Sequence, residues 1–534
     1  MTSTNQYDYI IVGAGSAGCV MAYRLSADPK ISVLLLEAGG SGRSVFVDMP
    51  KGVGFTMVSP KTTWPYRTSP ESKPYRAEQW TRGKSIGGSS LINGMMYVRG
   101  QPADYDEIAR QAGPDWAWDK IGAAYKALEN HELGAAATRG DSGPLHISMP
   151  TMRDSMPEAL IDAGTRMGLP RKQDVNEPDN GEAVGYAPST IYKGRRESAA
   201  RAFIDPIRQR PNLHIETGVV VDKLVFSGKR VIGVDASREG SAQQYRCRRE
   251  VIVAAGALAS PAILQRSGIG SAPLLQSLGV KLIAESPEVG SNLREHHAIV
   301  MQWRTPEIYS TNRGHGGARL LGNVARYYAK KDGLMAAATY ELGAWFKTRP
   351  ELDRPDGQFL LAPYSFDWSA SKLTVEALGG VQICAYILRP ESSGSLRIIS
   401  SDPARLPLIS PDYHGLESDR RKMVDVLRYA RRYMQQSPLA GKVTEETRPG
   451  VEFETDEQIL SAYDRFGAGG YHASGTCRMG SDERSVVDGR LRVRGVDGLR
   501  VVDTSIFPVM PAGNTNGPAM AMAWRAADLV IADQ

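Results

Sequence analysis

A glycine-rich stretch near the N-terminus has the residue types and spacing that bind a dinucleotide. Gly13, Gly15 and Gly18 form a G-x-G-x-x-G pattern, and Glu37 follows at the end of the next apolar segment. The first glycine allows a tight turn, the second lets backbone approach a pyrophosphate, and the third allows close packing of helix on strand. A glutamate at the ribose disfavours a 2′-phosphate. The pattern predicts a dinucleotide site and leaves FAD and NAD as alternatives.

The segments around these glycines have the pattern of a βαβ unit. The β-branched run 7–12 predicts a strand, 17–26 a helix and 33–36 a second strand. This context favours a dinucleotide site over an ordinary glycine-rich turn.

Two later blocks also have an α/β pattern. The first, 212–255, predicts strands at 219–221, 231–234 and 251–255; the second predicts a strand at 499–502, a Pro/Gly/Asn-rich loop and a helix at 519–531. Between them the patterning is mixed and rich in proline, glycine and aromatic residues. We therefore expect a discontinuous dinucleotide-binding domain with a second domain inserted in it. The expected segments are 1–150, 196–295 and 463–534 for the first domain, and 151–195 and 296–462 for the second.

The composition suits a large globular protein and excludes several classes. Of the 534 residues 42% are hydrophobic and 23% charged, so the chain can bury a sizeable core. Lys and Arg number 64 against 59 Asp and Glu, and the resulting charge of +5 is too weak to predict a nucleic-acid partner. The sequence does not define the oligomeric state.

The cysteines and the hydropathy pattern suggest a reducing compartment. Cys19, Cys247, Cys384 and Cys477 lie far apart with no C-x-x-C pair, so neither a disulfide framework nor a metal site is expected. No apolar stretch has the length of a membrane span, and no room is left for a signal peptide before residue 9. A cytoplasmic location is the expectation.

Four further motifs resemble those of the glucose-methanol-choline (GMC) oxidoreductases, in particular the bacterial branch of choline dehydrogenase-like enzymes and alcohol dehydrogenases or oxidases. Residues 82–100 (RGKSIGGSSLINGMMYVRG) are similar to the first family signature, and 256–270 (GALASPAILQRSGIG) to the second. Residues 472–480 (HASGTCRMG) resemble the catalytic histidine segment, and 503–508 with 514–518 the closing flavin loop. The resemblance spans the whole chain. It implies an α/β (α+β overall) fold with a Rossmann-like FAD-binding domain and an inserted substrate domain of antiparallel sheet and helices.

The resemblance also implies which residues hold FAD. Glycines at 87, 88 and 94 let main chain pass close to a planar cofactor, with short polar groups beside them, although a Gly/Ser turn alone has the same composition. Val220 is expected to reach the adenine through its backbone, and Asp503 with the 514–516 loop to hold the ribityl chain and the flavin. The expected cofactor residues are Gly13, Gly15, Ser16, Ala17, Gly18, Glu37, Ala38, Arg82, Gly83, Gly87, Gly88, Ser89, Asn93, Gly94, Met95, Val220, Ala255, Gly256, Asp503, Asn514, Thr515 and Pro518.

Some family members attach FAD through a histidine in the first signature. The aligned residue here is Ile92. Non-covalent FAD is therefore expected.

Oxidation of an alcohol through a flavin needs a base for the hydroxyl proton and a donor to the same oxygen. His472 suits the first task, because the ordinary pKa of histidine near 6.5 leaves it largely neutral. The resemblance places the partner just over forty residues later, where Asn514 and Asn516 both lie. The position of the following Pro-Ala-Met run selects Asn516 for the chemistry and Asn514 for the loop.

Substrate choice is expected to depend on the inserted domain. Met95 and Tyr471 are placed at the pocket by their motifs, and Trp345, Phe346, Tyr364, Phe366, Trp368 and Tyr386 are further aromatic candidates. These favour a neutral aromatic or aliphatic primary alcohol, oxidised to its aldehyde. Glu341 could serve a cation, which makes choline the second choice; a non-redox lyase on the same scaffold is the alternative from another class. The electron acceptor is expected to be a quinone or other carrier, or else O2. A dehydrogenase, which uses the former, is slightly favoured over an oxidase, which uses O2.

Overall fold

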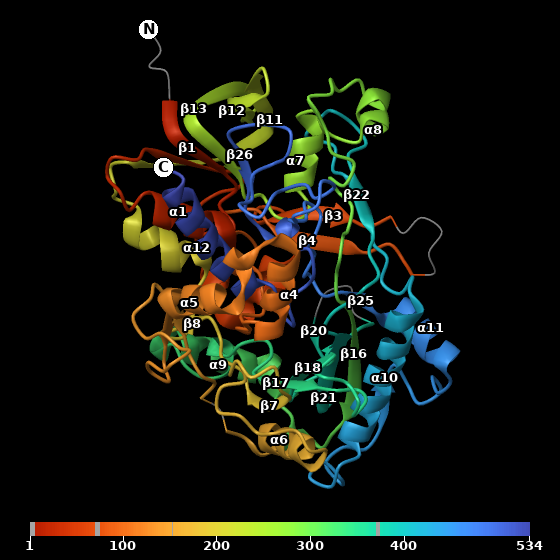
Figure 1. Cartoon of the computed structure of the whole chain (residues 1–534). Coiled ribbons are helices and arrows are strands. Elements are labelled where there is room, and N and C mark those ends of the chain that lie inside the picture. The colour runs from red at the N-terminus through yellow and green to blue at the C-terminus, as the bar shows by residue number, and fades with distance from the viewer. Residues whose placement is uncertain (1–5, 70–74, 152, 370–373) are drawn as a thin grey trace.

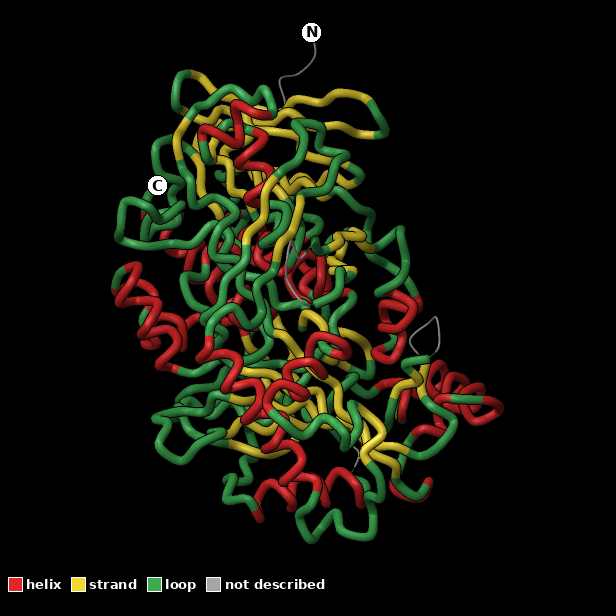
Figure 2. The backbone as a smooth tube through the Cα atoms, turned by 90° about the vertical axis from the view of Figure 1, so that its right-hand side faces the viewer, coloured by secondary structure: helices red, strands yellow, loops and turns green. Residues whose placement is uncertain are grey.

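The computed structural model describes residues 6–69, 75–151, 153–369 and 374–534. Within them the chain forms two seven-stranded sheets, which lie toward opposite ends of the molecule (Figure 1). The view from the side shows strands gathered in the same two regions (Figure 2). The overall fold is mixed helix and sheet, as the sequence predicted.

The first sheet has a parallel part and an antiparallel part. The order is β10-β2-β1-β13-β12-β11, with β26 paired to β13. The C-terminal half of β13 pairs in parallel with β1 and β26, and its N-terminal half pairs antiparallel with β12. Its strands come from three widely separated parts of the chain: β1 (Gln6–Val12), β2 (Val33–Glu37), β10 (Leu213–Thr217), β11 (Val219–Ser227), β12 (Arg230–Arg238), β13 (Ser241–Val253) and β26 (Leu499–Val501).

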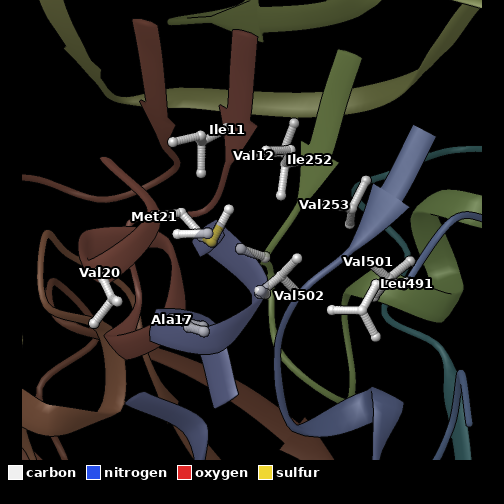
Figure 3. Packing of buried hydrophobic residues seen from close by; sticks show 14 of the residues in the cluster. Ile11, Val12, Ala17, Val20, Met21, Ile252, Val253, Leu491, Val501 and Val502 are labelled. Atoms are coloured by element: carbon white, nitrogen blue, oxygen red, sulfur yellow. The ribbon is translucent and has the colours of Figure 1, made fainter. Parts of the chain in front are cut away.

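The parallel strands of this sheet are buried, which accounts for their continuous apolar runs. All five residues of β2 are buried, and so are those of β1 after Gln6. Helix α1 (Ser16–Leu25) packs against α12 (Asn516–Ala532), which also packs against α5 (Trp118–Leu128). Figure 3 shows side chains of β1, α1, β13 and β26 meeting in this core.

The second sheet is antiparallel, with the order β24-β16-β21-β18-β17-β7 and β25 beside β16. Helices α6, α10 and α11 pack against it through one apolar cluster. Strand residues alternate between the two faces, as in any pleated strand. Thus Ile299 and Met301 join that cluster while Val300, between them, lines a cavity. The elements are β7 (Ala183–Tyr186), β16 (His297–Arg304), β17 (Leu342–Phe346), β18 (Gly357–Ala362), β21 (Gly380–Ile387), β24 (Glu446–Arg448), β25 (Ala468–Gly469), α6 (Ser155–Arg166), α10 (Glu417–Met434) and α11 (Asp456–Phe466).

Shorter elements connect and cover the two sheets. The remaining helices include α2 (Val45–Asp48), η1 (Pro50–Gly52), α3 (Val53–Thr56), η2 (Gly88–Leu91), α4 (Pro102–Ala112), α7 (Ser260–Arg266), α8 (Ala272–Ser277) and α9 (Gly317–Lys330). The two-stranded ladders are β3 (Thr63–Arg67) with β4 (Gln79–Gly83), β5 (Glu129–His131) with β6 (Leu145–Ile147), β8 (Ile191–Tyr192) with β9 (Arg195–Arg196), β14 (Ile269–Gly270) with β15 (Ala284–Glu285), β19 (Phe366–Asp367) with β20 (Thr374–Val375), and β22 (Ser395–Arg397) with β23 (Leu408–Ser410).

Every expected α/β element is present, and the C-terminal helix is longer than expected. It begins at Asn516 and includes Gly517 and Pro518, which the sequence suggested were loop. A proline is tolerated there because the N–H groups of the first helical turn make no hydrogen bond within the helix, so none is lost. The residues at which the two domains begin and end stay a prediction.

Gly18 offers a test of the packing at the start of α1. A Cβ added there would lie 1.9 Å from the carbonyl oxygen of Gly13. We expect Gly18→Ala to lower the free energy of unfolding by about 1–3 kcal/mol, because the turn and helix must separate. Thermal or urea unfolding measures this. The control is Gly322→Ala in α9, where an added Cβ meets nothing within 4 Å; equal stability of the two variants would contradict the expectation.

Candidate active site

A single cavity of about 1470 Å³ is lined by residues from both sheets. It exceeds the roughly 300–1,000 Å³ of a site for one small molecule. Its volume therefore suits a dinucleotide together with a second ligand.

The glycine-rich turn between β1 and α1 forms one end of this cavity. Gly13 has a φ of +99°, and a Cβ there would lie 2.6 Å from the carbonyl oxygen of Ala254. Gly15 is different, because an added Cβ would lie 4.0 Å from the nearest protein atom outside its chain neighbours, that same oxygen. Glycine at 15 is thus not required by the protein's own packing. Its place at the N-terminus of α1 fits close approach of a pyrophosphate.

Two buried carboxylates hold the backbone around this end. Glu37, the last residue of β2, accepts hydrogen bonds from the N–H groups of Ala14 (3.0 Å) and Gly39 (2.8 Å). Asp503 accepts from the N–H of Gly256 at 2.9 Å and from Ser260 Oγ at 2.5 Å. Burial raises the pKa of both carboxyls. Both residues line the cavity, and a carboxylate has further lone pairs for hydroxyl groups of a ligand.

The loop that begins at Arg82 lies against the glycine-rich turn. The N–H of Gly87 donates to the carbonyl of Ala14 at 2.7 Å, and a Cβ on Gly88 would lie 2.7 Å from the Cα of Gly15. Two backbone segments far apart in sequence therefore approach more closely than side chains would allow. Ile92 lies in this loop, buried at 5% exposure and at the cavity wall.

The cavity wall contains most, though not all, of the predicted cofactor residues. Gly18, Gly87 and Pro518 lie behind it, where Gly18 packs on the Gly13 carbonyl, Gly87 forms a left-handed turn, and Pro518 is buried in α12. Those at the wall are Gly13, Gly15, Ser16, Ala17, Glu37, Ala38, Arg82, Gly83, Gly88, Ser89, Asn93, Gly94, Met95, Val220, Ala255, Gly256, Asp503, Asn514 and Thr515.

His472 has Asn514 beside it, not Asn516. Asn514 Nδ2 lies 3.1 Å from His472 Nε2. Asn516 instead accepts a hydrogen bond on Oδ1 from Ser16 Oγ at 2.7 Å, which joins α12 to the glycine-rich turn. The position of the Pro-Ala-Met run, which selected Asn516, did not account for the bend of the 513–515 loop before α12 begins. The geometry favours Asn514 at His472, and Asn516 at the dinucleotide end.

His296 determines which nitrogen of His472 carries the proton. His296 Nε2 lies 2.9 Å from the carbonyl oxygen of Leu388, which only accepts, so this nitrogen must donate. Burial lowers the pKa of His296 to about 4, so the ring is neutral at pH 7 and its Nδ1 accepts. His472 Nδ1, 2.8 Å away, must therefore donate to it. This leaves a lone pair on His472 Nε2, facing the Asn514 amide.

Burial also keeps His472 neutral. Its pKa lies well below the ordinary value because of burial, then the nearby His296, then Arg82. The ring of His296 is held in place by stacking on Tyr386, with centroids 4.6 Å apart. A neutral histidine with an unprotonated Nε2 is the form required of a general base.

Glu295 positions the backbone of both histidines. Its Oε1 accepts from the N–H of His472 at 2.6 Å and from that of His296 at 3.0 Å, while Oε2 lies 3.3 Å from Arg82 Nη2. Burial raises the pKa of Glu295 to about 7, although Arg82 acts in the opposite direction. Neither His296 nor Glu295 was among the site residues expected from the sequence. The signal available was two adjacent histidines after an acid at a domain junction.

The two predicted pocket residues have strained backbones. Met95 has a φ of +67° and Tyr471 a φ of +65°, in the left-handed region that few non-glycine residues adopt. Both line the cavity. Such strain is found where a site over-determines the conformation. Of the aromatic candidates, Tyr364, Phe366, Trp368 and Tyr386 line the cavity, and Trp345 and Phe346 pack in the core.

Known proteins show the same organisation. Residues 7–298 and 390–523 match the two sequence models of the GMC oxidoreductases, so the chain belongs to this family of FAD-dependent oxidoreductases. It is 36% identical over 542 residues to an oxygen-dependent choline dehydrogenase of Chromohalobacter salexigens, covering 99% of this chain and 96% of that one. It is 38% identical over 544 residues to the protein of that name from Escherichia coli, covering 98% and 95%. The crystal structure of pyridoxine 4-oxidase from Mesorbium loti superposes with a TM-score of 0.87 at 30% identity, over 98% of each chain.

The hydrogen bond between His296 and His472 predicts that His296 has a role in catalysis in addition to its role in packing. We expect His296→Phe to slow flavin reduction by an alcohol about 10- to 1,000-fold while FAD stays bound, because His472 loses the acceptor that selects its tautomer. His296→Gln, whose Oε1 can accept from His472 Nδ1, should recover part of the rate. Anaerobic stopped-flow absorbance of the flavin measures both. Equal rates in Phe and Gln variants with full flavin content would contradict this role.

Proposed function

We propose that the protein oxidises an alcohol to its carbonyl compound, with His472 as the base and Asn514 as the hydrogen-bond donor to the reacting oxygen. The observation that supports it is the unprotonated Nε2 of His472 at the cavity wall, with the amide nitrogen of Asn514 3.1 Å away. FAD, when bound, supplies the acceptor for the hydride that leaves the carbinol carbon. No helix in the described part of the chain is long and apolar enough to cross a membrane; the cytoplasmic location stays a prediction.

An alcohol oxygen that contacts both His472 and Asn514 meets one acceptor and one donor. His472 Nε2 takes the hydroxyl proton, and the Asn514 amide donates to the oxygen as negative charge develops. On protonation His472 keeps its hydrogen bond to His296, since Nδ1 already donates. The proton transfer therefore requires no rearrangement of the buried histidines.

The cofactor is expected to be bound without a covalent link. Gly13 and Gly15 leave room for the pyrophosphate, Glu37 fits the ribose and Asp503 the ribityl end. Ile92 supports non-covalent binding, because it has no nucleophilic atom at the position where a histidine makes the link in some relatives.

We take a neutral aromatic or aliphatic primary alcohol as the substrate class, and choline as the second candidate. The aromatic side chains of Tyr364, Phe366 and Tyr386 at the cavity support the first. The names of the choline dehydrogenase relatives support the second. A quinone or other carrier is the proposed electron acceptor, with O2 as the alternative.

An anaerobic titration of the holoenzyme tests the proposal directly. We expect at least one primary alcohol from a panel that includes benzyl alcohol, 1-butanol and choline to bleach the oxidised-flavin band. Admission of air then distinguishes two classes of enzyme: in an oxidase O2 reoxidises the flavin rapidly and the colour returns, whereas in a dehydrogenase the colour returns slowly. A bound flavin that no alcohol bleaches would favour the lyase alternative, and a protein that does not bind FAD would overturn the cofactor assignment.

Substitutions separate the roles of the two asparagines. His472→Ala should retain FAD and slow flavin reduction by about 10²–10⁴-fold, the usual contribution of a general base.

Asn514→Ala should slow flavin reduction by about 10²–10³-fold, as for loss of one oxyanion donor. Asn516→Ala is the matched control, in which FAD affinity falls more than the reduction rate at saturating FAD. Unchanged reduction in His472→Ala would rule out this residue as the base.

A further inference from the structure

A lysine at the cavity wall has no part in the chemistry described above. Lys51, in η1 (Pro50–Gly52), lines the cavity that also contains His472. Its ammonium donates one hydrogen bond to the described part of the chain, to the carbonyl of Ala338 at 2.8 Å, and lies 4.7 Å from the ring centroid of Tyr364. An ammonium has three N–H donors, so two are left for a ligand.

The surroundings of Lys51 hold it near the loop of the first signature. The hydroxyl of Tyr364 donates to the carbonyl of Thr339 at 2.6 Å, and the N–H of Thr339 donates to the carbonyl of Gly94 at 3.3 Å. Gly94 is a predicted cofactor residue, and Met95 follows it. Lys51 therefore belongs to a wall that continues into the expected flavin loop.

Lys51 carries a positive charge at neutral pH. Burial lowers its pKa to about 8, while Glu341 acts in the opposite direction. His315, whose ring lies 5.3 Å from that of Tyr364, has its pKa lowered to about 3 by burial and by Lys51, and is neutral. Glu341, the acid considered for a cationic substrate, is not among the described residues that line the cavity.

The carboxylates at the cavity wall lie elsewhere. Among the described lining residues they are Glu37 and Asp503, and both accept hydrogen bonds from backbone N–H groups at the dinucleotide end. A quaternary ammonium beside Lys51 would meet a like charge in a partly buried space, where the described lining residues offer no carboxylate and Glu341 lies behind the wall. The face of Tyr364, which could receive such a cation, already has the lysine ammonium over it.

We infer that Lys51 determines the substrate class: the alcohol carries a carboxylate or another strong oxygen acceptor on a flat or apolar body, and quaternary ammonium alcohols are disfavoured. This inference rests on the proposed alcohol oxidation. It replaces the neutral class proposed above with alcohols that bear a carboxylate or another strong oxygen acceptor, and it separates this cavity from one suited to choline. The aromatic residues Tyr364, Phe366 and Tyr386 fit the body of such a molecule.

A binding experiment tests the inference without turnover. The holoenzyme is titrated with benzoate and, separately, with benzyltrimethylammonium, and the flavin absorbance difference spectrum gives each dissociation constant. We expect benzoate to bind at least about tenfold more tightly, as a charge-assisted hydrogen bond would give. Tighter binding of benzyltrimethylammonium would overturn the inference.

Turnover with variants then assigns the preference to Lys51. The measured quantity is the ratio of kcat/KM for 4-(hydroxymethyl)benzoate to that for benzyl alcohol. We expect Lys51→Met to lower this ratio about tenfold or more, and Lys51→Arg, which keeps the charge, to retain most of it. Flavin content reports whether each variant is folded. A ratio that is unchanged in a flavin-replete Lys51→Met enzyme would overturn the assignment.

The same measurements distinguish failure of the proposed alcohol oxidation from failure of the inference about Lys51. If no alcohol reduces the flavin, the alcohol oxidation fails, and preferential binding of benzoate would still locate an anion-binding group in the cavity. If alcohols reduce the flavin but benzoate does not bind more tightly than the cation, the oxidation stands and the inference about Lys51 is wrong.

Discussion

The hydrogen-bond chain from the Leu388 carbonyl through His296 and His472 to Asn514 is the interaction on which the site depends. Each contact in it has one possible direction once the carbonyl has assigned the first donor. The chain joins four segments that lie far apart in sequence. Because the rings are buried and neutral, loss of one link would leave an unpaired polar group in an apolar wall. The two sheets have to be placed so that these four segments meet.

Close backbone contact provides that placement at the other end of the cavity. A Cβ on Gly88 would lie 2.7 Å from the Cα of Gly15, so glycine at 88 lets the first-signature loop meet the β1–α1 turn, while Gly13 in that turn packs as closely on the carbonyl of Ala254. The carboxylate of Glu37 accepts from the N–H of Ala14 in the β1–α1 turn, and the carboxylate of Asp503 accepts from the N–H of Gly256 after β13. Met95, in the first-signature loop, and Tyr471, beside His472, both line the cavity and both have left-handed backbones.

The cavity wall carries charged groups of both signs. The carboxylates of Glu37 and Asp503 lie at the expected dinucleotide end, and the ammonium of Lys51 lies over the ring of Tyr364, with arginines elsewhere on the wall. High similarity to choline dehydrogenases therefore does not by itself extend to the ligand, since family motifs concern FAD and the base. A substrate is recognised by side chains outside those motifs, and these vary without disturbing the fold.

The sequence by itself determined the family, the parallel-sheet segments and the positions of the dinucleotide loop and of His472. Those features are local: a glycine pattern follows a strand, and a buried parallel strand shows as a continuous apolar run. Tertiary structure decided the rest. The choice of Asn514 over Asn516 depends on how a loop bends before α12, and His296 and Lys51 act through partners 176 and 287 residues away. No spacing rule encodes such contacts, because they form when separate segments fold against one another.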